Sequence, residues 1–296
     1  MNIHSWIQNN SIKNEKGELI EFDSHPFLFD IYSDNSQYLT IMKSAQVGLS
    51  TAAILRNHFD AKQNKLDLIY TLPTDNDVRI FVGGKVNRII ANNPCMIEDV
   101  TDKDSIEVKQ VGNSVIYFRG TFSEKQAIMV TADRLVHDEL DSSNLNVVAS
   151  YRARLQHSKY KQVHTFSHPN LPESGVHNDW LQSDQKHWFI KCPSCNEWQY
   201  LSWNTEVPSE MSVDIERKIF ICKKCHAKIP DYVRRNGQWV KKKSAAISGY
   251  WVSLLMAPWV SAEEIVKKFQ DPQTTPWFFY TRVLGLPYAD ASSKLL

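Results

Sequence analysis

Apolar residues along the first 170 positions alternate between short continuous runs and segments with helical spacing. Runs of four to eight apolar residues bounded by turn residues are typical of buried strands, and longer periodic segments are typical of helices. The strands expected on this basis cover residues 37–42, 65–73, 114–121, 134–141 and 161–169. Helices are expected at 51–64 and at 74–93, where Gly83 and Gly84 weaken the pattern, with one helical turn at 25–32. Residues 1–22 are expected to form a polar lead-in.

The order of these elements predicts the fold class. Strands that alternate with helices over residues 37–170 indicate a three-layer α/β domain with a mainly parallel sheet. Residues 188–235 carry two cysteine pairs and few helical signals, and the apolar residues 246–260 could return to the main sheet. Ser261 and the acidic residues after it predict a helix at 261–269. The expected division is a core at 1–185, an insertion at 186–236 and a return segment at 237–296.

Composition and charge narrow the class of protein. The chain has 42% hydrophobic and 23% charged residues, as in soluble globular proteins. It has no run of 18 apolar residues and no N-terminal apolar segment with a cleavage site, so neither a membrane span nor a secretory signal is expected. An intracellular protein is therefore expected. The net charge of +1 does not by itself indicate nucleic-acid binding. A DNA contact would need a local patch such as Lys241–Lys243, although such a triplet is more often a solvated loop.

Four of the five cysteines form two CxxC pairs. They are Cys192, Cys195, Cys222 and Cys225, with 26 residues between the pairs. Two such knuckles let four thiolates converge tetrahedrally on Zn²⁺ and fill its coordination sphere, which predicts a structural rather than a catalytic zinc site. The spacer exceeds the roughly 15–20 residues of the commonest pattern, and a ribbon that has lost its metal is the alternative. The fifth, Cys95, is expected to be an ordinary half-buried thiol.

The loop between the first strand and the first long helix reads KSAQVGLS, residues 43–50. A phosphate-binding loop presents backbone N–H groups at a helix N-terminus, with a lysine for the phosphates and a hydroxyl for Mg²⁺, and its usual pattern is GxxxxGK[ST]. Gly48 and Ser50 match, Leu49 stands where lysine is usual, and Lys43 stands at the first glycine. The match is weak on its own, and a chance strand–loop–helix is the alternative. Lys43 can still reach the phosphates because both ends of such a loop converge on them.

Asp138 and Glu139 follow a short apolar strand about 90 residues after this loop. In P-loop ATPases the first acid helps to hold Mg²⁺ and a neighbouring acid polarises the attacking water. An isolated pair of acids is usually surface charge. The position after a candidate phosphate loop, at a predicted strand end, makes the catalytic interpretation more specific.

In order and spacing these motifs resemble the ATPase portion of large terminases of tailed bacteriophages, in the lambda-type branch. The resemblance covers roughly residues 25–290. The stretches that carry it are 43–50, Leu68–Thr74, Phe118–Ser123, Val136–Asp141, Thr165–Pro169 and Gly285–Tyr288. It implies a P-loop ATPase of the ASCE type with a small zinc-ribbon insertion, in which ATP hydrolysis moves double-stranded DNA into a procapsid.

The resemblance also implies roles for individual residues. Lys43 would bind the β- and γ-phosphates, Ser50 and Asp138 would hold Mg²⁺, and Glu139 would be the general base. Ser167 would sense the γ-phosphate and couple hydrolysis to motion. The nucleotide-binding residues implied are Lys43, Ser44, Ala45, Gln46, Val47, Gly48, Leu49, Ser50 and Thr51, with His25 and Pro26 at the adenine. An ordinary helix start at Pro26 is the alternative for the last two.

Two positions depart from the family pattern. Gln46 stands where some terminases carry arginine, and His168 stands where threonine is usual in the coupling motif. The transition-state arginine must then come from elsewhere, and a neighbouring subunit is the usual source. The candidates are Arg88, Arg152 and Arg154, each of which could also be an ordinary surface arginine.

The resemblance implies double-stranded viral DNA, the small terminase subunit and the procapsid portal as partners, in the host cytoplasm and without a membrane. It implies a homo-oligomeric ring when active, with a monomer as the state of an isolated fragment. Large terminases also carry a C-terminal nuclease, but the residues after position 236 leave no room for a nuclease fold. We therefore expect residues 237–296 to form the return segment, a lid helix and a linker toward an absent nuclease domain, and we expect no nuclease activity.

Two alternatives remain at this point. One is a zinc-ribbon DNA-binding or capsid-docking protein with a degenerate nucleotide site. The other is a different nucleic-acid translocase, such as a helicase-type ATPase, although residues 180–296 lack the length and pattern of a second ATPase lobe.

Overall fold

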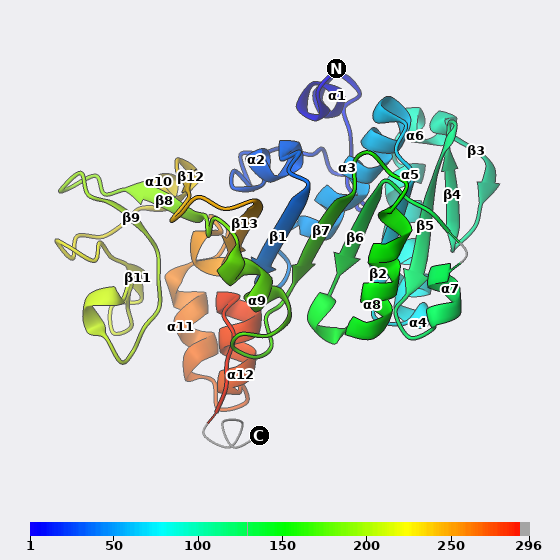
Figure 1. Cartoon of the computed structure of the whole chain (residues 1–296). Coiled ribbons are helices and arrows are strands. Elements are labelled where there is room, and N and C mark those ends of the chain that lie inside the picture. Colours follow the sequence, from blue (N-terminus) through cyan, green and yellow to red (C-terminus); the bar gives the residue numbers. More distant parts are fainter. Residues whose placement is uncertain (129, 291–296) are drawn as a thin grey trace. The chain divides into compact units, whose positions relative to one another are not determined.

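The computed structural model describes residues 1–128 and 130–290 (Figure 1). The chain divides into two compact units that interleave along the sequence, and each is described by itself. Unit 1 comprises Met1–Glu21, Asp30–Leu39 and Gly48–Phe166, and unit 2 comprises Phe22–Phe29, Thr40–Val47 and Ser167–Leu296. Residues 291–296, the end of the expected return segment, lie outside the described residues. No described helix has both the length and the apolarity that a membrane crossing requires.

Unit 1 is built on a mainly parallel sheet, which confirms the fold class expected from the sequence. Its strand order is β7-β6-β2-β5-β4-β3. The parallel strands are β2 (Leu68–Leu72), β5 (Ser114–Gly120), β6 (Arg134–Asp138) and β7 (Gln162–Ser167). Every position of β2 and β6 is buried, because helices cover both faces of the sheet. Strand β2 is accordingly a nearly continuous apolar run, whereas β6 also buries Arg134, His137 and Asp138.

An antiparallel edge completes this sheet and was not predicted. It consists of β3 (Val100–Asp104) and β4 (Val108–Val111), which pair with each other and with β5. At the other side, the N–H of Val163 in β7 donates to the carbonyl of Gln37 at 2.8 Å, just before β1 (Tyr38–Lys43). The first two residues of β1 belong to unit 1 and the rest to unit 2.

Successive residues of β2 point to opposite faces of the sheet, so each face has its own helices. On one face Ile69 packs with Leu135 and Val163 of the neighbouring strands and with Val147 and Tyr151 of α8 (Leu145–Arg152). On the other face Tyr70 lines a small cavity together with Phe118 of β5 and Ile54 of α3 (Leu49–Asn64). Unit 1 therefore has three layers. Further helices of this unit include α4 (Asp75–Phe81), α5 (Asn87–Ala91), α6 (Pro94–Asp99) and α7 (Glu124–Ile128).

The helix expected at 74–93 starts as predicted but is not continuous. Thr74 caps it in a capping box with Asp77, which satisfies two of the N–H groups at the helix start. A π-helix, η1 (Val82–Val86), then separates α4 from α5 and contains both Gly83 and Gly84. The glycines that weakened the pattern thus mark the segment in which the α-helical hydrogen bonding is lost.

The N-terminal residues are not simply a polar lead-in, and that expectation was wrong. Residues Ile3–Asn9 form α1, capped by the side chain of Asn2. The buried ring of Trp6 lies 5.7 Å from the ring of Phe59 and 6.2 Å from that of His58, both on α3. A helix of seven residues is too short for its periodicity to stand out from the sequence.

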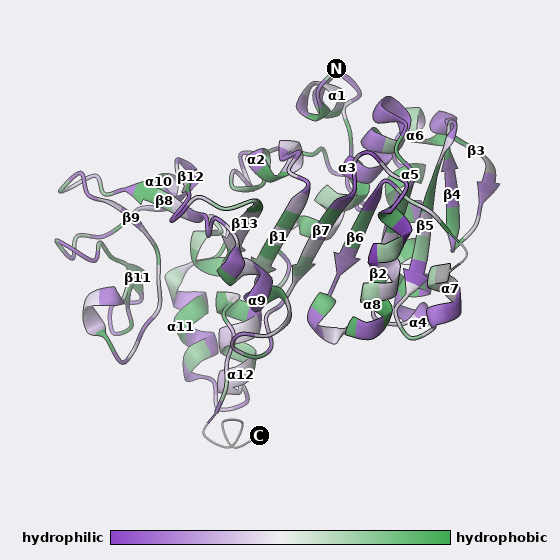
Figure 2. Ribbon diagram, viewed as in Figure 1, coloured by the Kyte–Doolittle hydropathy of each residue, from purple (hydrophilic) through white to green (hydrophobic). Residues whose placement is uncertain are grey.

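Unit 2 holds the return strand. β13 (Ile247–Val252) lies next to the end of β1, and the N–H of Ser44 donates to the carbonyl of Val252 at 2.8 Å. The return of residues 246–260 to the sheet is therefore confirmed. The helix expected at 261–269 is α11 (Ala262–Gln270), which begins with a capping box of Ser261 and Glu264. It carries both hydrophobic and hydrophilic residues (Figure 2).

The remaining elements of unit 2 include a small, separate set of strands. Three form an antiparallel sheet in the order β12-β8-β9. Their bounds are β8 His187–Lys191, β9 Trp198–Tyr200 and β12 Gln238–Val240. A second pair of strands consists of β10 (Val213–Asp214) and β11 (Ile219–Phe220). The unit also contains the helices α9 (Gly175–Gln182), α10 (Asp231–Arg235) and α12 (Pro276–Phe278) and the π-helix η6 (Phe279–Leu284). The part of α2 (Leu28–Ser33) before Asp30 also belongs to it.

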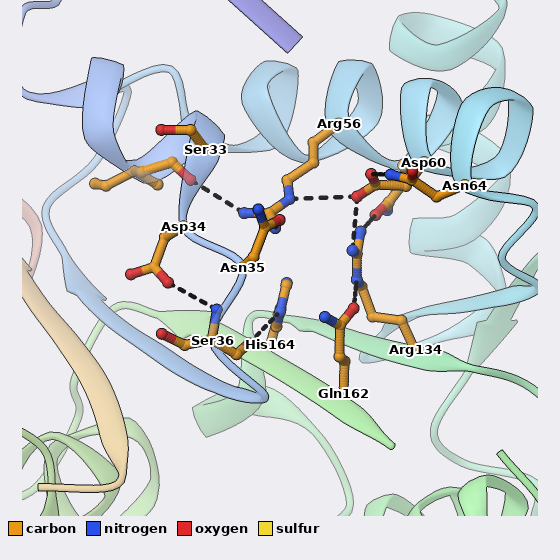
Figure 3. Close-up of polar contacts among 12 residues, drawn as sticks. Ser33, Asp34, Asn35, Ser36, Arg56, Asp60, Asn64, Arg134, Gln162 and His164 are labelled. Carbon is orange, nitrogen blue, oxygen red and sulfur yellow. Dashed lines mark hydrogen bonds and ion pairs between the residues drawn. The ribbon is translucent and has the colours of Figure 1, made fainter. Parts of the chain in front are cut away.

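A buried network of charges fixes α3 to the start of β6 in unit 1 (Figure 3). Oδ2 of Asp60 on α3 lies 2.6 Å from Nη2 of Arg134 and 3.4 Å from Nε of Arg56. Asn64 donates to the other oxygen of Asp60 at 2.6 Å, and Arg134 donates to Gln162 at 2.8 Å. Burial, with the charge of Arg134 nearby, lowers the pKa of Arg56 to about 10. The carboxylate of Asp60 thus contacts two buried guanidinium groups.

We predict that Asp60→Ala lowers the free energy of unfolding by about 3–5 kcal/mol, because it leaves both arginines buried without their counter-ion. Urea denaturation followed by circular dichroism measures this change. Asp23→Ala, at an exposed position, is the control and should leave the midpoint where it is. An Asp60→Ala protein with the parent's midpoint would show that the network adds nothing to stability.

Candidate nucleotide and metal sites

Helix α3 begins with an N-terminus that no side chain caps. Its N-cap residue is Gly48, with φ 82°, and no side-chain hydrogen bond is made there. The first-turn N–H groups of a helix have no acceptor within the helix, and the helix dipole adds partial positive charge at this end. Gln46 also has a positive φ, of 56°. Left-handed residues of this kind curve a loop so that its N–H groups converge, which is the geometry of an anion-binding loop.

The first residues of this loop are held by the C-terminal part of unit 2. The N–H of Ser44 donates to Val252, and the N–H of Ala45 donates to the carbonyl of Arg282, both at 2.8 Å. Gly285 has φ +65°, and a Cβ placed on it would come within 2.7 Å of the Ser44 nitrogen and 2.8 Å of the Lys43 carbonyl carbon. Only glycine fits there, because the main chain packs directly on the loop. This close packing explains why the Gly285–Tyr288 stretch begins with a glycine.

His168 holds Lys43 at two points. Its Nδ1 lies 3.1 Å from the carbonyl oxygen of Lys43, and its Nε2 lies 3.4 Å from Nζ of the same residue. Because a carbonyl can only accept, Nδ1 carries the proton, and Nε2 of the neutral ring is left to accept from the ammonium group. Ser167 donates through its hydroxyl to the His168 carbonyl at 3.0 Å. The residue that departs from the family pattern thus orients the lysine of the loop.

Glu139 is held in an unusual backbone conformation at the end of β6. Its φ is 57° and its ψ is 49°, in the left-handed region that is uncommon for residues other than glycine. Its N–H donates to the carbonyl of Phe166 at 2.9 Å, and its own carbonyl accepts from the N–H of Ser142 at 3.0 Å. Backbone strain of this kind is concentrated at functional positions of proteins. The side chain of Glu139 is half-exposed.

Asp138 and Ser50, the two residues expected to hold Mg²⁺, lie within hydrogen-bonding distance. Oδ2 of Asp138 accepts from the hydroxyl of Ser50 at 3.1 Å and from the hydroxyl of Tyr70 at 2.7 Å. Carboxylate and hydroxyl oxygens are suitable ligands for this cation. Burial and the charge of Asp138 raise the pKa of Tyr70 well above its usual range, so the phenol stays protonated and donates. Tyr70 was not predicted, because its contact with Asp138 depends on the pairing of β2 with β6.

The other expected nucleotide residues are distributed as follows. The hydroxyl of Thr51 donates to Glu15 at 3.2 Å. The ring of His25 lies 4.1 Å from the ring of Trp259, and burial lowers the pKa of His25. Pro26 precedes the start of α2 by two residues. Trp259 was not predicted, since it lies more than 200 positions from His25 in the sequence.

The three candidate arginines all lie in unit 1. Arg88 is exposed on α5, and Arg152 is exposed at the end of α8. Arg154 is half-buried in the 3₁₀ turn Ala153–Leu155. Burial, with the charge of Arg152 nearby, lowers the pKa of His137 to about 3, so that this strand residue is neutral. The choice among the three arginines stays a prediction.

The two CxxC segments form the same turn twice. The N–H of Cys192 donates to Glu197 at 2.9 Å, and the N–H of Asn196, at φ 61°, donates back to Cys192 at 3.0 Å. In the second segment the N–H of Cys222 donates to Ala227 and the N–H of His226, at φ 56°, donates back to Cys222, both at 2.9 Å. Each turn directs N–H groups and a pair of thiols toward one point.

The four sulfur atoms are spaced as a zinc site requires. All lie within 4.8 Å of one another, with 3.8 Å between Cys192 and Cys225 and 3.7 Å between Cys195 and Cys222. A regular tetrahedron with Zn–S bonds of 2.3 Å has sulfur atoms about 3.8 Å apart. The residues therefore fit Zn²⁺. Cys95 belongs to α6 in unit 1 and is not part of this cluster.

The sequence comparison and the structure comparison both find large terminases. Residues 20–244 match the sequence model of the family described as phage terminase large subunit gpA, ATPase domain. The solved ATPase domain of the Thermus phage P74-26 large terminase is similar with a TM-score of 0.54 at 10% identity, over 91% of this chain and 94% of that chain. An arginine-to-alanine mutant of the same Thermus phage domain gives 0.55 at 11% identity, over 93% and 96%.

A second solved protein of this kind is similar over a smaller region. The HK97 bacteriophage large terminase has a TM-score of 0.52 at 12% identity, over 60% of this chain. The match spans only 40% of the HK97 chain. At such identities the likeness to solved structures establishes the fold alone. No curated protein matches this sequence.

We predict that Tyr70→Phe lowers the free energy of unfolding by about 1–3 kcal/mol, because the buried Asp138 oxygen loses a donor. Urea denaturation measures the change. Tyr160→Phe, which removes a hydroxyl from an exposed ring, is the matched control and should not shift the midpoint. If the two variants unfolded at the same urea concentration, Tyr70 would not be supporting Asp138.

We predict about one zinc ion per chain in the purified protein, bound by the four thiolates. Cys195→Ser and Cys222→Ser should each lower the zinc content, as measured by inductively coupled plasma mass spectrometry after dialysis. Cys95→Ser removes a thiol outside the cluster and should keep the full content. Loss of zinc from all three variants alike, or its absence from the parent, would contradict the assignment.

Proposed function

This chain belongs to the family of phage terminase large subunit gpA ATPase domains, and on that premise we propose that it is the ATPase motor that moves double-stranded viral DNA into a procapsid. The observation that carries the proposal is the meeting of Ser50 with Asp138 beside the uncapped start of α3. A hydroxyl, a carboxylate and an anion-binding helix end are the parts that a P-loop ATPase needs for Mg²⁺ and phosphates. We propose the ASCE type of this fold for the core.

The proposed phosphate site consists of the loop N–H groups and the ammonium group of Lys43. The Nε2 atom of His168 holds that ammonium group at the front of the loop. This contact supports a role for Lys43 that does not need a lysine at position 49, where the usual motif has one. A single positive charge held against the β- and γ-phosphates neutralises charge in the ground state and in the transition state.

The proposed catalytic acids have separate tasks. Asp138 and Ser50 would hold Mg²⁺, which when bound neutralises phosphate charge. Glu139 would orient the attacking water and accept its proton, and general-base catalysis of this kind contributes about 10²–10⁴-fold. The left-handed backbone of Glu139 supports this role because it turns the side chain out of the strand direction. An arginine from a neighbouring copy, with Arg88, Arg152 and Arg154 as candidates, would complete the site and add about 10³–10⁵-fold.

Coupling to movement is proposed to start at Ser167 and His168. Ser167 ends β7, and His168 follows it and contacts the residue that would bind the γ-phosphate. A change at the phosphates would thus be transmitted to the segment between β7 and α9. We propose that the active form is a ring of copies of this chain, and that viral DNA, the small terminase subunit and the portal are its partners. The proposed division is a core at 1–185, a ribbon at 186–236 and a return and lid segment at 237–296.

We predict that Lys43→Ala weakens the binding of an ATP analogue at least tenfold, about 1.4 kcal/mol, because the phosphates lose their positive partner. Glu139→Gln should bind the analogue with an affinity close to the parent's, and its turnover should fall by about 10²–10⁴-fold. Titration calorimetry measures binding, and phosphate release measures turnover.

Lys16→Ala, at an exposed position of unit 1, is the control and should match the parent in both assays. Parent-like hydrolysis by Lys43→Ala and by Glu139→Gln would refute the proposed site.

A further inference from the structure

Positive charge is concentrated in one part of a nearly neutral chain. Residues 186–243 contain 12 lysines and arginines and 6 aspartates and glutamates, a net charge of +6. The whole chain has a net charge of +1, so the other residues sum to −5. A zinc ion with four thiolates contributes −2, which leaves this segment at +4. The segment therefore attracts polyanions although the whole chain does not.

Several of these cations are available to a partner. Some are neutralised within the chain, since Arg217 pairs with Asp214 and Lys224 pairs with Glu197, both at 2.6 Å. Five others are exposed and make no ion pair within the part of the chain that the structure describes. They are Lys191, Lys228, Arg235, Lys241 and Lys242.

On one face of the small sheet β12-β8-β9, aromatic side chains lie beside one of these lysines. Lys191 lies directly opposite Trp198, and Phe189 opposite Tyr200, so these four side chains share one face of the sheet. On the other face, Trp188, Ile190 and Gln199 are buried. Trp198 is 44% exposed, and Nζ of Lys223 lies 4.2 Å from the centre of the Tyr200 ring. We call the face with Phe189, Lys191, Trp198 and Tyr200 the Trp198 face.

Two of these cations, Lys191 and Lys241, lie toward opposite ends of this sheet. Lys191 ends β8, whereas Lys241 follows Val240, which pairs with His187 at the start of β8. A strand of five residues is about 16 Å long. Duplex DNA carries about ten phosphate charges over that length of its axis. The spacing of the lysines therefore suits several phosphates of one duplex.

We propose that the Trp198 face and the lysines at both ends of β8 bind the sugar–phosphate backbone of duplex DNA. The inference rests on the proposed packaging function, from which the choice of DNA comes. The lysines contact phosphates, and the exposed Trp198 ring packs against deoxyribose between them. Such contacts are independent of sequence, as a surface that follows moving DNA requires.

The test is the binding of a fluorescein-labelled random-sequence duplex, followed by anisotropy at several salt concentrations without nucleotide. The variant Lys191→Ala/Lys241→Ala/Lys242→Ala should bind at least tenfold more weakly near 0.1 M salt. Its plot of log affinity against log salt should be less steep by about 3, since each lost phosphate contact removes about 0.9. Trp198→Ala should weaken binding with the slope unchanged.

The control is Lys16→Ala/Lys65→Ala/Lys159→Ala, which removes the same charge from exposed positions of unit 1 and should bind like the parent. Equal weakening by both triple variants, or parent-like binding by the first, overturns the proposal. Tighter binding to a single strand than to the duplex also overturns it. ATP-analogue affinity and zinc content are measured on each variant, so that failure of the nucleotide site is distinguished from failure of this surface.

Discussion

Helix α3 and strand β6 are bonded to each other at both ends, and the candidate site depends on this double attachment. At one end Asp60 binds Arg134 at 2.6 Å, and at the other Ser50 donates to Asp138 at 3.1 Å. Ten residues of helix rise about 15 Å and four residues of strand about 13 Å, so the two spans match. A slip of α3 along β6 would break both contacts. The ion pair at the remote end therefore sets the position of the hydroxyl at the functional end.

Within unit 2, residues that are far apart in the sequence contact the same few main-chain groups of the loop. Val252, Arg282 and Gly285 contact the main chain of residues 43–45, and His168 contacts both the carbonyl and the ammonium group of Lys43. Residues of three of the stretches recognised in the sequence, 43–50, 165–169 and 285–288, thus meet in one local environment. Their spacing along the chain reflects the elements that lie between them.

Local residue patterns predicted most of the helices and strands of the sheet core. The details of the candidate site depend on contacts between these elements, which local patterns do not encode. A buried parallel strand such as β2 is predictable because helices on both faces of the sheet favour a nearly continuous apolar run. The paired cysteines are equally predictable because both turns are local. Helix α1 was not predicted because seven residues give little periodicity. Strands β3 (VTDKD) and β4 (VKQV) were not predicted because they contain few apolar residues. Tyr70 and His168 lie in recognisable segments, but their contacts depend on the register of β2 with β6 and on the position of β7's end. No local pattern encodes these.

The close packing of Gly285 on the loop has a mechanical consequence. The carbonyls of Leu284 and Gly285 both accept from the indole of Trp251 at 3.0 Å, and the N–H of Tyr288 donates to Asn170 at 3.1 Å. The stretch after η6 is thus anchored on both sides of a residue that touches the Lys43–Ser44 peptide. A pull on the chain at Tyr288 would first load its main-chain hydrogen bond to Asn170 and the bonds from the Trp251 indole. The main chain of Gly285 lies directly against the peptide at the front of the loop, so a displacement of Gly285 would reach that peptide by main-chain contact.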